Sequence, residues 1–183
     1  MLREFGPIKR RRYTEKRTVS SEREKHRPKR SLQPQRRLVI IDGYNVIYAW
    51  DSLREIADFS LEKARDALMD MLSNYVAYTK NEVTLVFDAY RVKDGAGSDF
   101  QKDGYRVVYT KENQTADTYI EQMMHELGPN FHIRVVSGDR LLQISAVHSG
   151  VSRVTTKEFE EELIAVGNEI NEFVKRLAET QKA

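Results

Sequence analysis

Acidic residues recur in this sequence at points where predicted strands end. Asp42, Asp88 and Asp139 each stand just after a short apolar run, and Asp117 lies in the first turn of a predicted helix. Glu121 follows Asp117 by four residues, which places the two carboxylates on the same helix face. The carboxyl ends of parallel strands share one edge of an α/β sheet, where ligand sites form. We therefore expect these five carboxylates to converge although they lie far apart in the chain.

A cluster of this kind predicts a divalent metal. Carboxylates held side by side raise one another's pKa, and a cation relieves that repulsion. Mg²⁺ takes oxygen ligands, keeps several waters and suits one or two carboxylates together with a substrate phosphate. A bound metal lowers the pKa of a water and stabilises charge on phosphate oxygens. The pattern therefore predicts a Mg²⁺ or Mn²⁺ site that cleaves phosphodiester bonds, with a ligand set of Asp42, Asp88, Asp117, Glu121 and Asp139.

Each acid also has an ordinary structural interpretation. An aspartate after a strand, such as Asp88, is more often a turn residue or a helix cap. Asp139 could simply cap the helix that follows it, and Asp117 could favour the helix dipole. Asp42 is harder to explain in this way because it directly ends the most hydrophobic predicted strand. The joint pattern favours the metal site more than any single residue does.

The elements that position these acids alternate between short apolar runs and longer helical segments, as in βαβ units with a mostly parallel sheet. Strands are predicted at residues 38–41, 83–87, 105–109, 132–136 and 151–154. Helices are predicted at residues 60–79, 115–127 and 139–148, and for about twenty residues at the C-terminus. Ser60 is the predicted N-cap of the first helix, and Thr155 with Glu158 forms a capping box for the last. Residues 91–104 contain three glycines and alternating charge, which predicts an exposed loop.

The bulk composition suits one folded domain with an appendage. The 183 residues contain 40% hydrophobic residues and no cysteine, which excludes disulfides, thiolate metal sites and a cysteine nucleophile. The absence of cysteine fits a cytoplasmic protein. No apolar run approaches the ~20 residues that would span a bilayer, so we predict no membrane association.

Charge divides the chain at residue 37. Residues 1–37 hold 14 Lys and Arg and four Glu, a net charge of +10, whereas residues 38–183 carry a net charge of −8. We predict that residues 1–37 form a basic, mostly disordered arm or linker and that residues 38–183 form the domain. The arm could bind RNA or a ribosome surface in a salt-sensitive way, or it could act only as a solubilising leader.

A family resemblance sharpens this interpretation. The segment IDGYNVI at residues 41–47 resembles the signature of the NYN nucleases, relatives of the PIN domains, and more closely that of the bacterial YacP-like branch. The segments FDA (87–89), YTKEN (109–113), TAD (115–117), IE (120–121) and SGD (137–139) with Gln143 follow in the order of that branch. The resemblance covers roughly residues 38–165. It implies a PIN-like Rossmannoid fold, a three-layer α/β sandwich with a central, mostly parallel sheet, and a metal-dependent endoribonuclease in mRNA decay that acts on the ribosome.

Carried over by position, the resemblance implies roles for single residues. Asp42, Asp117 and Asp139 would be the core ligands, supported by Asn45, Asp88 and Glu121, and the catalytic set would be Asp42, Asn45, Asp117 and Asp139. Gly138 departs from close relatives, which often carry serine there. Residues 3–11 also resemble a linker in translation-factor GTPases that carry this domain at their C-terminus, which would make the chain part of such a fusion.

Aromatic and basic residues near the acids are candidates for contact with RNA. Tyr44 and Tyr90 could stack on bases, or they could pack at the rim of the site. Arg91, Lys111 and Arg140 lie in predicted loops or helix starts and could hold phosphates, although most charged loop residues are simply solvated.

Three other functions compete with a nuclease. A PIN-like domain could bind RNA or ribosomes without catalysis, but all the acidic positions are present. A haloacid-dehalogenase-like phosphatase needs a second aspartate two residues after the first, where Tyr44 stands. A receiver domain needs adjacent acids and a late lysine, and neither is evident.

Overall fold

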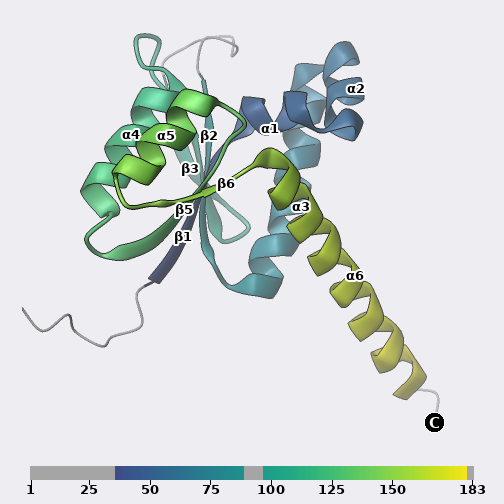
Figure 1. The fold of residues 1–183 in the computed structure, drawn as a ribbon. Helices are drawn as coiled ribbons and strands as arrows, with labels where there is room; N and C mark the ends of the chain where they lie inside the picture. Colours follow the sequence, from purple (N-terminus) through teal and green to yellow (C-terminus); the bar gives the residue numbers. More distant parts are fainter. Residues whose placement is uncertain (1–35, 89–96, 181–183) are drawn as a thin grey trace, which may run out of the picture. The chain divides into compact units, whose positions relative to one another are not determined.

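One six-stranded sheet forms the centre of the structure, with the strand order β3-β4-β2-β1-β5-β6 (Figure 1). The computed structural model describes residues 36–88 and 97–180, which all fall in one unit spanning residues 34–183. The strands are β1 (Arg36–Asp42), β2 (Glu82–Phe87), β3 (Ser98–Lys102), β4 (Tyr105–Tyr109), β5 (Phe131–Val136) and β6 (Ser152–Val154). Every neighbouring pair is parallel except β3 and β4, so β1, β2, β4, β5 and β6 end at the same edge.

Helices cover both faces of this sheet. They are α1 (Gly43–Ala49), α2 (Asp51–Phe59), α3 (Leu61–Thr79), α4 (Ala116–Leu127), α5 (Arg140–His148) and α6 (Thr156–Thr180). Figure 1 shows α4 and α5 on one side of the sheet and α1, α3 and α6 on the other. None of the helices in the described part of the chain is long and apolar enough to cross a membrane.

Two apolar cores separate the three layers. Val39 and Ile41 of β1 pack with α1, α3 and α6, whereas Leu38 and Ile40 pack with α4 and α5. Alternate residues of a strand point to opposite faces, so a continuous apolar run is buried on both sides. The predicted α/β fold, a three-layer sandwich with a mostly parallel sheet, is confirmed.

The predicted helix starts are also present. Ser60 caps α3 by accepting a hydrogen bond from the Lys63 amide, and Thr115 caps α4 in the same way. In the capping box of α6, the Thr155 amide donates to Glu158 Oε2 at 2.7 Å and the Glu158 amide donates to Thr155 Oγ1 at 3.2 Å. The structure adds α1 and α2, in a stretch to which the sequence pattern assigned no element.

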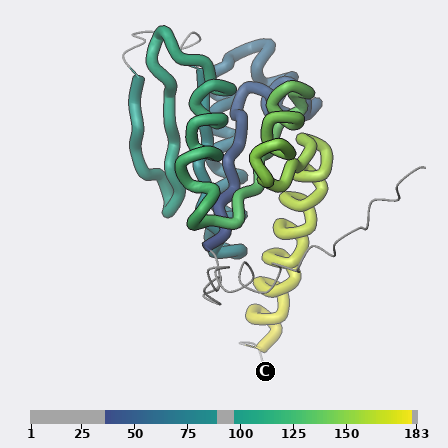
Figure 2. Tube along the Cα trace, turned by 60° about the vertical axis from the view of Figure 1, so that its left-hand side comes forward, coloured from purple at the N-terminus to yellow at the C-terminus, as the bar shows by residue number. Residues whose placement is uncertain are grey.

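The prediction of an exposed loop over residues 91–104 was wrong in its second half. Residues 98–102 form strand β3, which pairs with β4 and makes one edge of the sheet (Figure 2). Asp103 and Gly104 form the turn of this hairpin with φ values of 46° and 87°, and Asp-Gly is a strong signal for such a turn. The residues of β3 are mostly exposed and polar, so no apolar alternation marks the strand.

Candidate active site

Asp42 is the buried acid at the carboxyl edge of the sheet. Only 7% of the residue is exposed. Its Oδ1 accepts a hydrogen bond of 3.2 Å from the Asn45 amide, which caps α1, and its Oδ2 accepts one of 3.5 Å from the Ser137 hydroxyl. Burial raises the pKa of Asp42 to about 6, and the nearby charges of Asp117 and Asp139 add to the rise. A perturbed carboxyl in this position is the expected mark of a functional site.

Asp117 lies at the centre of the group of acids. It stands in the first turn of α4, where Thr115 caps the helix. Burial raises the pKa of Asp117, and so do the charges of Asp139, Glu121 and Asp88. Asp42, Asp88 and Asp117 line one cavity, and Glu121 and Asp139 lie near enough to Asp117 for their charges to raise its pKa.

Asp139 has the structural role that the sequence offered as one interpretation. Its Oδ1 accepts hydrogen bonds from the amides of Leu141 at 2.8 Å and Leu142 at 3.0 Å, so it caps α5. Because both bonds end on the same oxygen, capping does not use the whole carboxylate. The Asp139 amide donates to the Ser137 hydroxyl at 3.0 Å, and that hydroxyl donates to Asp42. Capping and ligand binding are therefore compatible.

Asn45 joins the end of β1 to the site loop, which we define as residues 137–139. Its Oδ1 accepts a hydrogen bond of 2.6 Å from the Gly138 amide. A Cβ on residue 138 would lie 2.8 Å from that oxygen, so glycine permits this close approach. The departure at Gly138 therefore has a local explanation. On the other side of the loop, Gln143 Nε2 donates to the Ser137 carbonyl at 2.6 Å.

Four of the predicted polar residues line one cavity of about 540 Å³: Asp42, Asn45, Asp88 and Asp117. Tyr48 also lines it and is 39% exposed. Sequence reasoning missed Tyr48, although its spacing of four residues from Tyr44 places both on one face of α1. Ser137 was also missed as a site residue, because its contact with Asp42 joins residues 95 positions apart.

The donor set fits a hard divalent cation with an open coordination sphere. Carboxylate oxygens are the ligands that Mg²⁺ and Mn²⁺ prefer. Within residues 36–88 and 97–180, however, no three acidic or histidine side chains are placed to hold one ion together. Mg²⁺ characteristically keeps several waters and uses one or two carboxylates plus substrate phosphates. Asp42 and Asp117, which line the same cavity, suit that arrangement better than a closed protein cage.

The residues predicted to contact RNA are dispersed. Tyr44 is buried: its ring packs on Phe87 with centroids 5.1 Å apart, and its hydroxyl accepts from Arg65 at 3.1 Å. Tyr44 also lines the acidic cavity, so it packs at the rim of the site and its contact with RNA stays a prediction. Lys111 is exposed beside a separate cavity of about 230 Å³, and Arg140 is exposed at the start of α5. Tyr90 and Arg91 lie outside the described residues.

Comparison with known proteins gives consistent matches. The profile of the YacP-like NYN domain matches residues 39–183. The protein YacP of Bacillus subtilis (strain 168) is 33% identical over 149 residues, which cover 80% of this chain and 86% of that protein. The crystal structure of Rae1 (YacP) from Bacillus subtilis superposes with a TM-score of 0.69 at 32% identity, over 79% of this chain and 83% of that one. A mutant of the same protein also gives a TM-score of 0.69, at 30% identity over 78% and 84% of the two chains.

Proposed function

Since the chain belongs to the YacP-like NYN domain family, a family of PIN-like nucleases, we propose that it is a metal-dependent endoribonuclease. The observation that carries the proposal is the buried carboxyl of Asp42, which faces a cavity shared with Asp117 and has its pKa raised to about 6. A carboxyl with no binding role would not be expected to remain buried among like charges.

Asp42 and Asp117 would hold the cation, and Asp139 would hold its waters with the oxygen that capping leaves free. Asp88 and Glu121 would support these three. When bound, Mg²⁺ or Mn²⁺ supplies a water of lowered pKa and stabilises charge on the phosphate oxygens. The chain itself fixes the orientation of the Asp42 carboxylate, because the Asn45 amide and the Ser137 hydroxyl each bond to a different oxygen. Asn45, by holding Gly138, keeps the Asp139 loop beside Asp42.

The substrate we propose is messenger RNA, cut on or near the ribosome. The family resemblance suggests this setting, and the charge distribution is compatible with it. The body of residues 38–183 has a net charge of −8, which repels a polyanion. The +10 charge of residues 1–37 would offset that repulsion by binding RNA phosphates or ribosomal RNA.

A second candidate function is an RNA- or ribosome-binding module without catalysis. It is favoured by one observation: in the described part of the chain, no three acids are positioned to hold a single ion. On this view the acids would be a structural remnant, and their substitution would leave RNA cleavage at background in every variant.

Cleavage of a labelled single-stranded RNA in Mg²⁺, Mn²⁺ or EDTA tests the proposal. We expect wild type to cut only with metal, and both Asp42→Asn and Asp139→Asn to lose cutting. Asparagine caps helices about as well as aspartate, so these variants should fold. Asp58→Asn, an exposed position on α2, is the matched control and should cut like wild type.

If free RNA is not cut, the same proteins should be tested on translating ribosomes. Cutting there that needs Asp42 supports the nuclease. Cutting that survives in Asp42→Asn contradicts it. Binding without cutting, on ribosomes as on free RNA, would favour the second candidate.

A further inference from the structure

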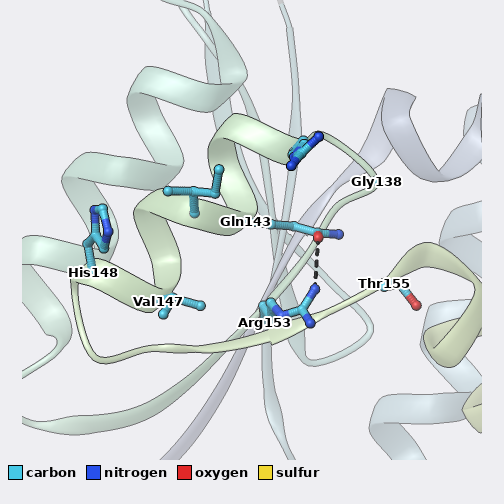
Figure 3. Close-up of a pocket in the computed structure, with 8 residues that line it drawn as sticks. Gly138, Gln143, Val147, His148, Arg153 and Thr155 are labelled. Carbon is cyan, nitrogen blue, oxygen red and sulfur yellow. Dashed lines mark hydrogen bonds between the residues drawn. The ribbon is translucent and has the colours of Figure 1, made fainter.

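A second cavity, of about 680 Å³, runs along α5 and β6 (Figure 3). We call it the basic groove and define it by Arg140, Gln143, Ile144, Val147, His148 and Arg153. Gly138 of the site loop also lines it, so the groove reaches the loop that carries Asp139. Nothing in the proposed chemistry uses this cavity.

The charge of the groove is opposite to that of the acidic cavity. Arg140 and Arg153 are both exposed, and no carboxylate is among the described residues that line the groove. Glu158 lies outside the groove. Its pKa is lowered chiefly by its bonds to Thr155 and to a smaller extent by the charge of Arg153. Two arginines therefore face solvent on a domain that is acidic as a whole. This arrangement suits an anionic ligand.

The groove also has an apolar lining. Ile144 is 44% exposed and Val147 is 55% exposed, and both lie on the outward face of α5. Arginines beside exposed aliphatic side chains match the two halves of a nucleotide, a charged phosphate and an apolar base face. A base can reach such a lining only from a single strand, because bases in an RNA duplex are stacked and paired.

Hydrogen bonds connect the groove to the acidic site. Arg153 Nη1 donates to Gln143 Oε1 at 3.2 Å, as Figure 3 shows, and Gln143 Nε2 donates to the Ser137 carbonyl at 2.6 Å. Ser137 in turn donates through its hydroxyl to Asp42. A chain that entered the groove would therefore lie against the residues that support the site loop.

We propose that the basic groove binds the single-stranded RNA that flanks the cleavage position, with its phosphates on Arg140 and Arg153 and a base against Ile144 and Val147. This inference rests on the proposed ribonuclease function, because it assigns the groove to the same substrate.

The test is the affinity of the full chain for a fluorescent oligouridylate of about ten nucleotides, a length within the range of single-strand sites. It is measured in EDTA, so that no metal-dependent cutting intervenes. We expect the double variant, which combines Arg140→Gln and Arg153→Gln, to bind roughly tenfold more weakly at moderate salt. The slope of log Kd against log salt should fall by about 0.7 for each phosphate contact that is lost. Arg176→Gln, which removes the same charge from the exposed end of α6, is the control and should bind like wild type. The basic arm is common to all the variants.

A second pair of variants separates charge from structure. Arg153→Lys keeps the charge but loses the planar guanidinium that bonds to Gln143, whereas Arg153→Gln loses both the charge and the guanidinium. We expect the lysine variant to keep most of the affinity and the salt slope. Equal losses in both variants would overturn the proposal, because the effect would then come from the Gln143 bond. Unchanged binding in the double glutamine variant would overturn it as well.

The two proposals fail in different ways. If wild type cuts RNA but the double variant binds as tightly as wild type, the groove assignment falls and the nuclease stands. If no RNA is cut under any condition but the double variant loses affinity as expected, the groove binds single-stranded RNA, and the nuclease falls together with the link to a cleavage position.

Discussion

The acidic cavity and the basic groove meet at the same site loop but are built differently. In the cavity, Asp42 is buried and the hydrogen bonds of Asn45 and Ser137 hold its carboxylate. In the groove, Arg140 and Arg153 are exposed on α5 and β6. A buried, fixed carboxylate suits chemistry that needs one geometry. Exposed cations beside aliphatic side chains suit a chain that must be held and then released. If both proposals hold, cutting and holding of RNA are divided between two neighbouring surfaces.

The largest expected effect comes from the cavity side of this contrast. Asp117→Asn should lower the rate of RNA cleavage at saturating metal by about 100-fold or more, because Asp117 lines the cavity at the centre of the acids. Glu121→Gln, one turn farther along α4, is the comparison and should lower it by only about tenfold. Single-turnover cleavage measures both. Equal effects would mean that the two acids do not differ in their role.

The next effect is on stability and follows from the pKa of Asp42. The folded pKa is raised from 3.8 to about 6, so between these values the folded state holds more protons than the unfolded state. Stability from this group is present below pH 4 and is lost as pH rises through about 6. An asparagine side chain cannot ionise, so Asp42→Asn should be more stable than wild type at pH 7 by at most roughly 3 kcal/mol.

Urea unfolding at pH 4 and pH 7, in EDTA, measures this difference. The two proteins should converge at pH 4. Arg140→Gln is the control from the groove and should show no such pH-dependent gain. If Asp42→Asn is less stable than wild type by the same amount at both pH values, burial of the charged Asp42 carboxylate does not destabilise the protein.

A third effect is the stabilisation of the protein by a divalent cation, which should depend on the acidic cavity and not on the basic groove. Mg²⁺ or Mn²⁺ binds only the cavity on this view, and binding to the folded state raises stability. The midpoint of thermal unfolding of wild type should rise by about 2–4 °C for each kcal/mol of binding energy. The rise should be absent in Asp117→Asn and retained in Arg140→Gln. A rise that persists in Asp117→Asn would place the cation elsewhere.

Sequence patterns predicted much of the acidic cavity. The apolar runs that end in Asp42 and Asp88 indicated the strands, and the parallel topology made their ends converge with Asp117. These features are local, because each depends on residues within one strand or one helix turn. The same local reasoning found the caps Ser60 and Thr115.

The groove could not be predicted in this way. It depends on Arg153 of β6 reaching Gln143 of α5, a contact between two elements whose residues carry no shared pattern. Strand β3 was missed for a related reason. Its residues are stabilised by the ladder with β4 and by the Asp103-Gly104 turn, not by burial of an apolar face. The Ser137 bridge to Asp42 likewise exists only after the sheet has formed.

The smallest effect we expect concerns the loop that both regions share. In Gly138→Ala, the new Cβ would lie 2.8 Å from Asn45 Oδ1, so the Asn45 side chain must move and the 2.6 Å bond to residue 138 must weaken. We expect a loss of stability of about 1 kcal/mol. Gly167→Ala in α6 is the matched control, because a Cβ there would meet nothing within 4 Å beyond its own stretch of helix backbone. That variant should gain roughly 0.5–1 kcal/mol of stability from helix propensity.

Urea unfolding measures the stability of both variants, and RNA cleavage should fall severalfold in Gly138→Ala alone. If both alanines stabilise the protein, the Asn45 clamp does not hold the site loop, and the cavity and the groove are then less closely coupled than their hydrogen bonds indicate.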